Sequence, residues 1–500
     1  MPISVRGQRA AGPPYSTFDL RISNPMERTD PQYIDALRFL LDRINYERSD
    51  DRPYDAKSFR LARMAFLLER LGQPQRSAPV IHIAGTKGKG SVAWLVAEML
   101  RHAGFRTGLY TSPHLEHLEE RFVIDGRPVS PQDLVESMRR LQTACEACVA
   151  SEHGTPTFFE LTTALGWMLF QSANTHVNVI EVGLGGRLDS TNVCDPILSI
   201  ITSISYDHQQ QLGATLDKIA FEKAGIIKPG VPVIHGARAP LARDVIRNVA
   251  HQRGCELWEL GRDFEATIRT QALALGSKSA SSFEHDSPSQ CLTFESRFPT
   301  IHPPSRSELP LRMLGRHQAD NAAMAIAVWS KLRQDGWALP EEALLQSLAQ
   351  TQVAARIESM PGNPMLILDA GHNEASIEAL MQTLGECYLA QRRTLVFACS
   401  KDKKAHEMLE RMLPQCDRMI LTQFHSNPRA LQVEKLEAIA RSIASPIDTE
   451  LAEILTAPDV ATAIDYAART AIDGELLCVT GSFFVAAEAR MLCMQRRPAN

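Results

Sequence analysis

The sequence lacks the features of membrane, secreted and nucleic-acid-binding proteins. Over its 500 residues no apolar run approaches the roughly 18 residues that a membrane helix needs. The first residues carry no secretory signal, and ten cysteines at irregular spacing predict buried thiols in a reducing compartment. Lys and Arg total 53 against 58 Asp and Glu, a formal net charge of −5 that disfavours nucleic acid as a partner. We expect a cytoplasmic protein that binds neither membranes nor nucleic acid.

Aromatic residues are also scarce, at 6% of the chain, but the remaining composition is that of an ordinary globular protein. Hydrophobic residues make up 44% and charged residues 22%. At roughly 150 residues per domain, the length predicts two large domains or about three smaller ones. Cys145 and Cys148 form a CxxC motif, but no second pair lies at zinc-ligand spacing and the segment has a helical pattern. We interpret both cysteines as core residues.

The hydrophobic pattern predicts the α/β fold class. Beyond residue 78, apolar runs of strand length alternate with longer segments of helical period, as in parallel sheets covered by helices. We expect a disordered arm over 1–28, a large parallel-sheet domain over 29–353, and a smaller Rossmann-like α/β domain over 354–500. Polar residues replace the pattern over 264–307. This segment is interpreted as a variable insertion, either a small antiparallel excursion or a long loop.

The strongest local signal is the segment GTKGKGS, Gly85 to Ser91, between a predicted strand and a predicted helix. Glycines let several N–H groups point at one anion, the helix N-terminus adds partial positive charge, and Lys89 neutralises phosphate oxygens. The spacing departs from the strict Walker pattern because Gly90 separates Lys89 from Ser91. Since both flanking elements are present, a phosphate-binding loop is favoured over a tight turn with an exposed lysine.

Polar residues near three later strand ends could complete a nucleotide site. Ser112, Glu181 and His208 follow or close apolar strands, and ligands of open parallel sheets bind beyond the carboxyl ends of the strands. A glutamate in an apolar strand is costly to bury unless it is paired or holds a metal, which favours a function for Glu181. Taken alone, Ser112 is better interpreted as a turn serine, and His208 as an exposed or core histidine.

Other charged residues have no role that spacing alone can assign. Lys223 lies on a predicted helix, where a lysine is usually exposed, and Glu160 opens another helix, where it could simply complement the helix dipole. Asp369 and His372 stand at the end of a strand in the second sheet. Charged and imidazole groups at a strand end suggest a site without defining its chemistry.

Seven ordered blocks carry a resemblance to a known family. In chain order they are GTKGKGS, TSPHLEHLEERF, TFFELTTAL, EVGLGGRLDSTNV, DHQQQLGATLDKIAFEKAGIIKPG, GRHQADNAAMA and LDAGHN. From about Tyr33 to Ala487, the sequence resembles the folylpolyglutamate synthase and dihydrofolate synthase family, within the Mur-type ATP-dependent amide ligases. The resemblance implies a P-loop domain like the central Mur ligase domain, followed by a smaller C-terminal domain.

The resemblance also implies a reaction. ATP would phosphorylate a carboxylate of dihydropteroate, of tetrahydrofolate and other reduced folates, or of both, and the amine of L-glutamate would attack the acyl phosphate and release phosphate. Such an enzyme is an ADP-forming acid–amino-acid ligase. A carboxylate resists amines until one of its oxygens becomes part of a good leaving group, so the chemistry is physically reasonable. We expect a monomer, because two domains of one chain make a complete site.

By resemblance, the catalytic residues are Lys89, Lys223 and His372. The implied ATP-binding residues are Gly85, Thr86, Lys87, Gly88, Lys89, Gly90, Ser91, Asn321, Arg356 and Asp369. The implied ligands of Mg²⁺, of which two ions are expected, are Ser91, Ser112, Glu181 and His208. Lys223 matches the family's carbamylated lysine, in which carbon dioxide turns the amine into a carboxylate that ligates or orients the second Mg²⁺. The implied substrate-binding residues are His114, Arg121, Phe159, Glu160 and, for glutamate, Ser482.

The second-domain motif departs from the family pattern. The family commonly reads Asp-Gly-Ala-His-Asn-Pro, whereas this chain has Asp369, Ala370, Gly371 and His372, with Glu374 in place of the proline. The aspartate and histidine survive, so we expect activity. The alternatives are a Mur-type amino-acid ligase with a non-folate acceptor, a nucleotide-binding P-loop protein without ligase activity, and a homologue that has lost catalysis.

Overall fold

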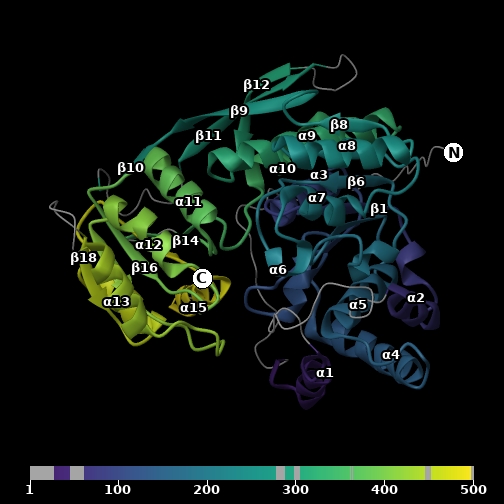
Figure 1. Ribbon diagram of the computed structural model, residues 1–500, viewed down its shortest axis with the longest axis horizontal. Helices are drawn as coiled ribbons and strands as arrows, with labels where there is room; N and C mark the ends of the chain where they lie inside the picture. Colours follow the sequence, from purple (N-terminus) through teal and green to yellow (C-terminus); the bar gives the residue numbers. More distant parts are fainter. Residues whose placement is uncertain are drawn as a thin grey trace.

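The computed structural model describes residues 28–44, 61–276, 288–297, 305–360, 362, 364–444 and 452–496. Two α/β domains lie side by side, and the N-terminal one is the larger (Figure 1). Within the described residues, no helix is both long enough and apolar enough to cross a bilayer. The α/β fold class is confirmed.

An eight-stranded sheet forms the centre of the N-terminal domain, in the order β4-β3-β2-β5-β1-β6-β7-β8. Its strands are β1 (Val80–Ala84), β2 (Thr107–Tyr110), β3 (Phe122–Ile124), β4 (Arg127–Pro128), β5 (Val177–Glu181), β6 (Leu198–Ile201), β7 (Val233–His235) and β8 (Leu257–Glu259). From β2 to β8 neighbouring strands are parallel, whereas β3 and β4 add an antiparallel edge. The carboxyl ends of the parallel strands therefore meet at one edge of the sheet.

Helices cover both faces of this sheet. They are α1 (Pro31–Leu41), α2 (Leu61–Arg70), α3 (Lys89–His102), α4 (Pro131–Val149), α5 (Phe158–Ser172), α6 (Gln209–Leu212), α7 (Leu216–Ala224), α8 (Pro240–Gln252), α9 (Arg316–Gln334) and α10 (Glu341–Gln350). Side chains of β1 alternate between the faces: Ile81 and Ile83 pack with α3, α9 and α10, whereas Val80 and Ala84 face the other helices. Fully burying each isoleucine contributes about 1.5–3 kcal/mol, which fixes the strand beneath the phosphate loop.

The polar segment after residue 264 contains a three-stranded antiparallel sheet rather than an irregular loop. Strand β11 (Ser289–Ser296) pairs with both β9 (Phe264–Gln271) and β12 (Ser305–Leu311). Beyond β9, the short strand β10 (Leu273–Ala274) crosses to the other domain and pairs with β15 (Tyr388–Leu389). The three-stranded sheet lies along one side of both domains (Figure 1), and the β10–β15 pair links the two domains.

The C-terminal domain has its own six-stranded sheet, in the order β13-β14-β19-β16-β17-β18. Its strands are β13 (Glu358–Met360), β14 (Met365–Leu368), β16 (Arg392–Phe397), β17 (Arg418–Leu421), β18 (Glu453–Thr456) and β19 (Glu475–Thr480). Its helices are α11 (Glu374–Cys387), α12 (Ala405–Met412), α13 (Val433–Ala444), α14 (Val460–Arg469) and α15 (Phe483–Arg496). Only β13 is antiparallel to its neighbour. The expected boundary at residue 354 falls in the link between α10 and β13.

Other expectations can be placed in this fold. Cys145 and Cys148 lie on α4 and are buried, and all ten cysteines are free thiols. The expected disordered arm over 1–28 lies outside the described residues except for Arg28.

Candidate active site

A cavity of about 630 Å³ opens where the two domains meet, at the carboxyl ends of the strands. It is lined by most of the residues that the sequence singled out: Thr86, Lys87, Gly88, Lys89, Gly90, Ser91, Ser112, His114, Arg121, Phe159, Glu160, Glu181, His208, Asn321, Arg356, Asp369, His372 and Ser482. Gly85 and Lys223 do not line it. These lining residues span almost 400 positions of the chain. Their places at strand ends alone did not predict that both domains would contribute to one cavity.

Two glycines of the phosphate loop are required by its geometry. Gly85 has φ +147° and a Cβ there would lie 1.8 Å from Thr202 Oγ1. Gly88 has φ +85°, and a Cβ would lie 2.3 Å from Asn321 Oδ1 on α9. Helix α3 begins at Lys89, directly after this turn. The loop therefore has the tight backbone and helix N-terminus that an anion site needs.

Backbone and hydroxyl contacts anchor the loop to the residues that directly follow β6. The N–H of Thr86 donates to Ser203 O at 2.7 Å, and the Thr202 hydroxyl donates to Lys87 O at 2.7 Å. Asn321 Nδ2 donates to Gln318 Oε1 at 2.8 Å, so the amide oxygen of Asn321 is oriented by its own helix. These bonds hold the loop in one shape before any nucleotide binds.

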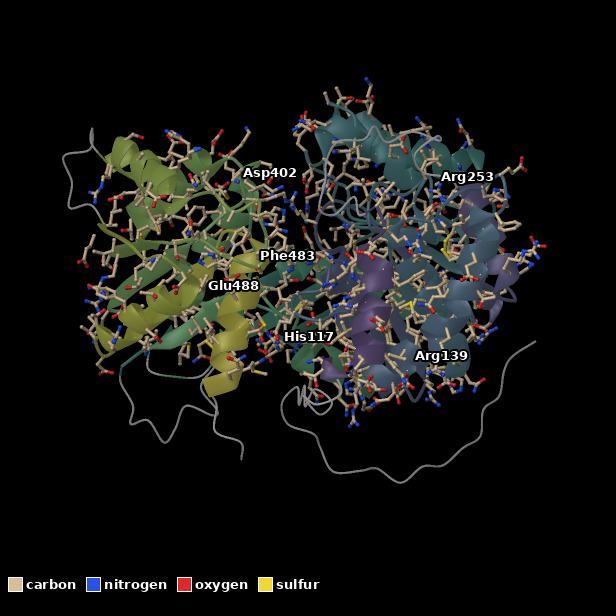
Figure 2. All side chains as sticks on the ribbon, turned by 90° about the horizontal axis from the view of Figure 1, so that it is seen from below. His117, Arg139, Arg253, Asp402, Phe483 and Glu488 are labelled. Carbon is tan, nitrogen blue, oxygen red and sulfur yellow. The ribbon has the colours of Figure 1, made fainter. Side chains whose placement is uncertain are left out.

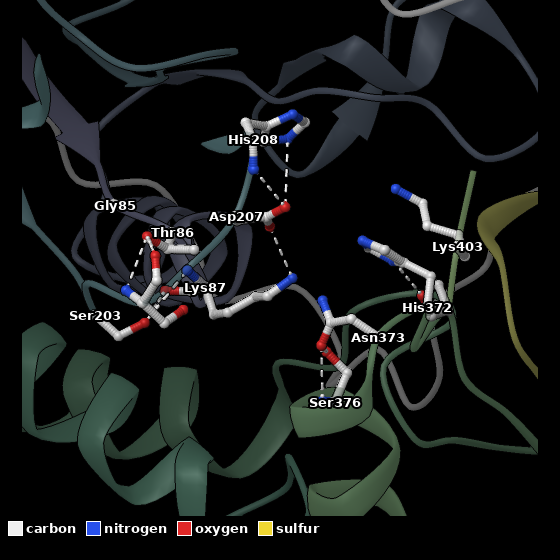
Figure 3. Close-up of polar contacts among 12 residues, drawn as sticks. Gly85, Thr86, Lys87, Ser203, Asp207, His208, His372, Asn373, Ser376 and Lys403 are labelled. Carbon is white, nitrogen blue, oxygen red and sulfur yellow. Dashed lines mark hydrogen bonds and ion pairs between the residues drawn. The ribbon is translucent and has the colours of Figure 1, made fainter. Parts of the chain in front are cut away.

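The first lysine of the loop is paired with an acid that sequence reasoning missed. Lys87 Nζ lies 3.1 Å from Asp207 Oδ2 (Figure 3). The Lys87 charge helps hold the pKa of Asp207 well below its usual range, although burial opposes this, and burial lowers the pKa of Lys87 itself. Asp207 directly precedes the predicted ligand His208, in the block DHQQQLG, so proximity to that residue was an available signal. His208 Nε2 lies 3.9 Å from Asp207 Oδ1 and its ring is half exposed.

Glu181 is buried beside the loop. One carboxylate oxygen accepts the Ser112 N–H at 3.2 Å, and a Cβ on Gly90 would lie 3.7 Å from that same oxygen. Burial raises the pKa of Glu181, which the charges of Lys89 and Arg356 oppose. Among the described residues, no three His, Cys, Asp or Glu side chains form a ready metal cluster. A cation here would need hydroxyl and phosphate oxygens besides this carboxylate.

Lys223 is buried rather than exposed, in contrast to the usual position of a helical lysine. Its side chain reaches from α7 to the phosphate loop, where Nζ donates to Gly85 O at 2.8 Å. Burial, reinforced by the positive charge of Lys89, lowers the pKa of Lys223 well below its usual value. Burial therefore disfavours the charged form of this amine, which lies next to the phosphate loop.

The C-terminal domain contributes an arginine held in an unusual backbone. Arg356 lies between Ala355 and Ile357, which have φ +51° and +48°, a region that β-branched residues rarely adopt. The guanidinium of Arg356 stacks 5.0 Å above the ring of Phe483, which Figure 2 labels where the two domains meet. Asp369 Oδ2 accepts the Ile357 N–H at 3.1 Å and so braces this backbone.

Asp369 also accounts for the glycine at position 371 of the altered motif. Its other oxygen accepts the Gly371 N–H at 2.8 Å, and a Cβ on Gly371 would lie 2.8 Å from that oxygen. The small residue is thus required at 371 in this backbone, while Ala370 is buried in the contact between the domains. Burial raises the pKa of Asp369, opposed chiefly by Arg356.

His372 faces the cavity with one nitrogen defined. Its Nδ1 lies 3.0 Å from Ala370 O, so Nδ1 must carry the hydrogen and Nε2 the lone pair. Burial, with the nearby Lys87 charge, lowers its pKa to about 3. Figure 3 shows it next to Lys403, a lysine to which sequence reasoning assigned no role. Ser482 lies nearby, and its hydroxyl caps α15 by accepting the Val485 N–H at 3.1 Å.

At the far end of the cavity, the predicted substrate residues are tied to one another. Arg121 Nε donates to His114 Nδ1 at 2.7 Å, and its guanidinium lies 5.3 Å from the ring centre of Phe158. The ring of Phe159 packs against Gly183, where a Cβ would lie only 2.3 Å from it. Glu160 lies at the third position of α5, in a capping box with Thr157, and so has the helix-terminal position expected of it.

Models of two families match the chain. The Mur ligase middle domain matches residues 83–329, and the Mur ligase glutamate ligase domain matches residues 355–483. A dihydrofolate synthase/folylpolyglutamate synthase of Bacillus subtilis is 34% identical over 70% of this chain and 78% of its own length. The folylpolyglutamate synthase of Lacticaseibacillus casei is 33% identical over 77% of this chain and 86% of its own length.

Solved structures agree with this likeness. A Mycobacterium tuberculosis folylpolyglutamate synthase complexed with ADP has a TM-score of 0.77 at 31% identity, covering 94% of this chain and 99% of that one. Escherichia coli FolC in complex with DHPP and ADP has a TM-score of 0.75 at 26% identity, covering 93% of this chain and 98% of that one. The likeness spans both domains and the cavity between them.

Proposed function

This chain belongs to the dihydrofolate synthase/folylpolyglutamate synthase family of Mur ligases, and on that premise we propose that its cavity joins L-glutamate to a folate-type carboxylate. It is an ATP-dependent acid–amino-acid ligase whose acceptor is dihydropteroate, a reduced folate, or both. One observation carries the proposal: a single cavity joins a phosphate loop, an arginine from the second domain and an apolar end lined by Phe159. Relatives bearing this name and FolC bound to DHPP and ADP support it.

The first step is phosphoryl transfer to the acceptor. N–H groups of the phosphate loop and the ammonium of Lys89 bind the phosphates of ATP. The acceptor carboxylate attacks the γ-phosphorus, the bond to the ADP oxygen breaks, and an acyl phosphate forms. Arg356 enters from the other domain, where its charge stabilises the phosphoryl group during transfer, as an arginine finger does. Asn321 and Asp369 are proposed to contact the adenine and the ribose.

The second step is amide formation. The amine of glutamate attacks the acyl carbon, the bond from that carbon to the phosphate oxygen breaks, and the released phosphate takes up the proton that the amine loses. His372 remains neutral, and its Nε2 lone pair accepts a hydrogen bond from the incoming amine, which aligns the amine nitrogen. Ser482 and the nearby basic side chain of Lys403 are proposed to bind the glutamate carboxylates. The attack requires both domains, because the acyl phosphate and the amine are held on opposite walls.

The residues around Glu181 suit Mg²⁺. The buried carboxylate of Glu181 lines the same cavity as the hydroxyl residues Ser91 and Ser112, and together they offer the hard oxygen donors that this ion prefers. We assign the ion to these three residues, with His208 as a further ligand. Bound there, Mg²⁺ would neutralise the charge of the phosphates. Burial raises the pKa of Glu181, and a bound cation would lower it again by stabilising the carboxylate.

Lys223 is proposed to be carbamylated. A neutral amine is the form that attacks carbon dioxide, and burial of Lys223 lowers its pKa and so favours that form. The nitrogen forms a bond to the carbon of CO₂ and releases one proton, so an N–H is replaced by a carboxylate next to the phosphate loop. That charge offsets Lys89 and can orient a second Mg²⁺.

The assembly and the location remain part of the proposal. Both walls of the cavity come from one chain, which supports a monomer. Ten free thiols support a reducing compartment such as the cytoplasm.

The test is glutamate-dependent ADP release by the purified protein with ATP and Mg²⁺, assayed in parallel with dihydropteroate and tetrahydrofolate. We expect ADP release only when acceptor and glutamate are both present, with a product heavier than the acceptor by one glutamate residue. ADP release at the same rate with and without glutamate would instead support a P-loop protein without ligase activity.

A further inference from the structure

The apolar end of the cavity contains a buried ion pair whose role is not explained by the reaction steps. This end, named here the acceptor end, is lined by Leu41, Leu61, Phe159, Leu184 and Leu188. Among these apolar groups lie Arg63, from α2, and Glu160, from α5. A charged pair in such surroundings costs free energy unless its hydrogen-bonding groups are used.

Arg63 uses only part of its hydrogen-bonding capacity within the protein. Its Nε lies 2.9 Å from both carboxylate oxygens of Glu160, and its side chain is only 9% exposed. A guanidinium has five N–H donors, and the four on Nη1 and Nη2 have no partner among the described residues. Arg63 therefore brings unused donors to the cavity while Glu160 fixes its orientation.

Three of the four carboxylate oxygens at the acceptor end accept two or more hydrogen bonds from the protein, whereas Glu160 Oε1 accepts only that of Arg63 Nε within the part of the chain that the structure describes. Besides Arg63, Glu160 accepts the N–H of Thr157 at 2.7 Å and its hydroxyl at 2.9 Å. Asp189 accepts the N–H groups of Thr191, Gly183 and Leu184 at 2.9, 3.1 and 3.0 Å. Among these charged groups, the donors left for a ligand are those of Arg63, beside one accepting site on Glu160 Oε1.

We propose that Arg63 binds the pterin ring of the acceptor and selects the 7,8-dihydro oxidation state, through paired hydrogen bonds from Nη1 and Nη2 to O4 and N5 of the ring. This inference rests on the proposed function. A 2-amino-4-oxo-7,8-dihydropterin carries two adjacent acceptor atoms on one edge only, where O4 lies beside the imine nitrogen N5. The pairing is the one that arginine makes with O6 and N7 of guanine.

The oxidation state of the ring decides whether this edge fits. In a 5,6,7,8-tetrahydropterin N5 carries a hydrogen, so one donor of Arg63 would face another donor in a buried site. Buried polar groups left without a partner are costly, and sites built to hydrogen-bond a substrate discriminate strongly against an analogue that lacks the partner. Phe159 supplies an apolar face that suits either ring equally, so the selection falls to Arg63.

The experiment compares 7,8-dihydropteroate with 5,6,7,8-tetrahydropteroate, which differ only in the reduction of the N5–C6 bond. Wild-type protein and Arg63→Lys are assayed for kcat/KM with each acceptor, under anaerobic conditions that keep the rings reduced. Lysine preserves the charge opposite Glu160 but lacks the planar pair of donors. Arg418→Met is the matched control, because Arg418 is also a mostly buried arginine, 2.7 Å from Glu453, and lies away from the cavity.

The wild type should prefer the dihydro acceptor, and Arg63→Lys should lower kcat/KM for that acceptor by about 10- to 100-fold, the range of one bidentate pair. The same variant should change the value for the tetrahydro acceptor by less than about threefold, and ATP affinity should be unchanged. An equal loss for both acceptors, or no loss for the dihydro acceptor, would overturn the role of Arg63.

Absence of glutamate-dependent turnover in the wild type with every acceptor would instead refute the proposed function. In that case, binding of the two pteroates, followed by their intrinsic fluorescence, tests Arg63 independently.

Discussion

The two walls of the cavity are held in different ways. On the N-terminal wall, Lys87 is paired with Asp207 and Lys223 donates to a loop carbonyl. On the C-terminal wall, Arg356 is held by the face of Phe483 and by a backbone braced from Asp369. The first wall is a preformed anion site, whereas the second presents its arginine and its histidine only when the domains lie together. From this difference we expect nucleotide binding at the first wall and completion of the proposed catalytic site by the second to be separable events.

One buried ion pair links the walls directly. Arg490 Nη1 on α15 lies 2.7 Å from Glu116, in the N-terminal loop that includes Ser112, and Arg490 Nε lies 3.2 Å from Glu358. Leu115 of the same loop packs against Phe483, with Ala355, Ala370 and Ala486. The N-terminal loop that includes Ser112 therefore docks on the domain that carries Arg356.

The largest effect should come from the N-terminal wall. Lys223→Ala removes the group proposed to become a carboxylate beside the phosphates, so we expect kcat to fall at least about 1,000-fold. Short carboxylic acids such as acetate should restore part of the activity. Steady-state assays with and without the acid check this.

Lys218→Ala is the matched control, because Lys218 is exposed on the same helix. It should keep wild-type activity, and circular dichroism should show both variants folded. Full activity of Lys223→Ala would refute the carbamylated lysine.

On the C-terminal wall, Arg356→Ala should lower kcat about 100- to 1,000-fold, since it removes the arginine proposed to stabilise the transferred phosphoryl group. Nucleotide affinity should change far less, because the preformed wall remains. Titration with ADP, followed by calorimetry, separates the two quantities. Arg333→Ala removes a comparable arginine over Trp329, at 4.6 Å, and should have no effect on turnover. Equal losses of kcat and of ADP affinity would contradict a functional division between the walls.

Breaking the link between the walls should have a smaller effect. Arg490→Met leaves Glu116 and Glu358 without their partner and should raise KM for the acceptor about tenfold with a lesser change in kcat, because loop docking costs more free energy. Arg441→Met, at an exposed pair with Glu437 at 2.8 Å, controls for loss of a charge. An unchanged KM in Arg490→Met would show that loop docking does not depend on this pair.

The smallest effect on activity concerns a buried histidine beneath the preformed wall. His82 in β1 is fully buried, and burial lowers its pKa to about 3 from an ordinary value of 6.5. Between these two values the unfolded chain binds one more proton than the folded protein, so stability should fall as the pH is lowered from 6.5 towards 3, by roughly 1 kcal/mol per pH unit. Urea unfolding at pH 6.5 and pH 5 measures the difference, and His82→Gln should reduce it while leaving activity at neutral pH largely intact. An identical pH dependence in that variant would exclude His82 as the source.

Local patterns were enough to predict the alternation of strands and helices, the phosphate loop and the residues at strand ends. They could not place Lys223, because its burial depends on how α7 packs against the loop rather than on its own helix. Arg63 and Arg490 were missed for the same reason: each lies in a helical stretch, and its partner is 97 or 374 positions away. The resemblance to a family suggested roles for the seven sequence blocks, but ion pairs between separate segments require the fold.

The most direct test of the ligase mechanism follows an oxygen atom. Dihydropteroate labelled with ¹⁸O in both carboxylate oxygens is incubated with the enzyme, ATP, Mg²⁺ and L-glutamate, and the released phosphate is analysed by mass spectrometry. If the carboxylate is phosphorylated and then attacked by the amine, each phosphate carries one ¹⁸O and each amide forms with one ADP. Phosphate without ¹⁸O would mean that ATP is hydrolysed by water, and the acyl-phosphate account of this cavity would be wrong.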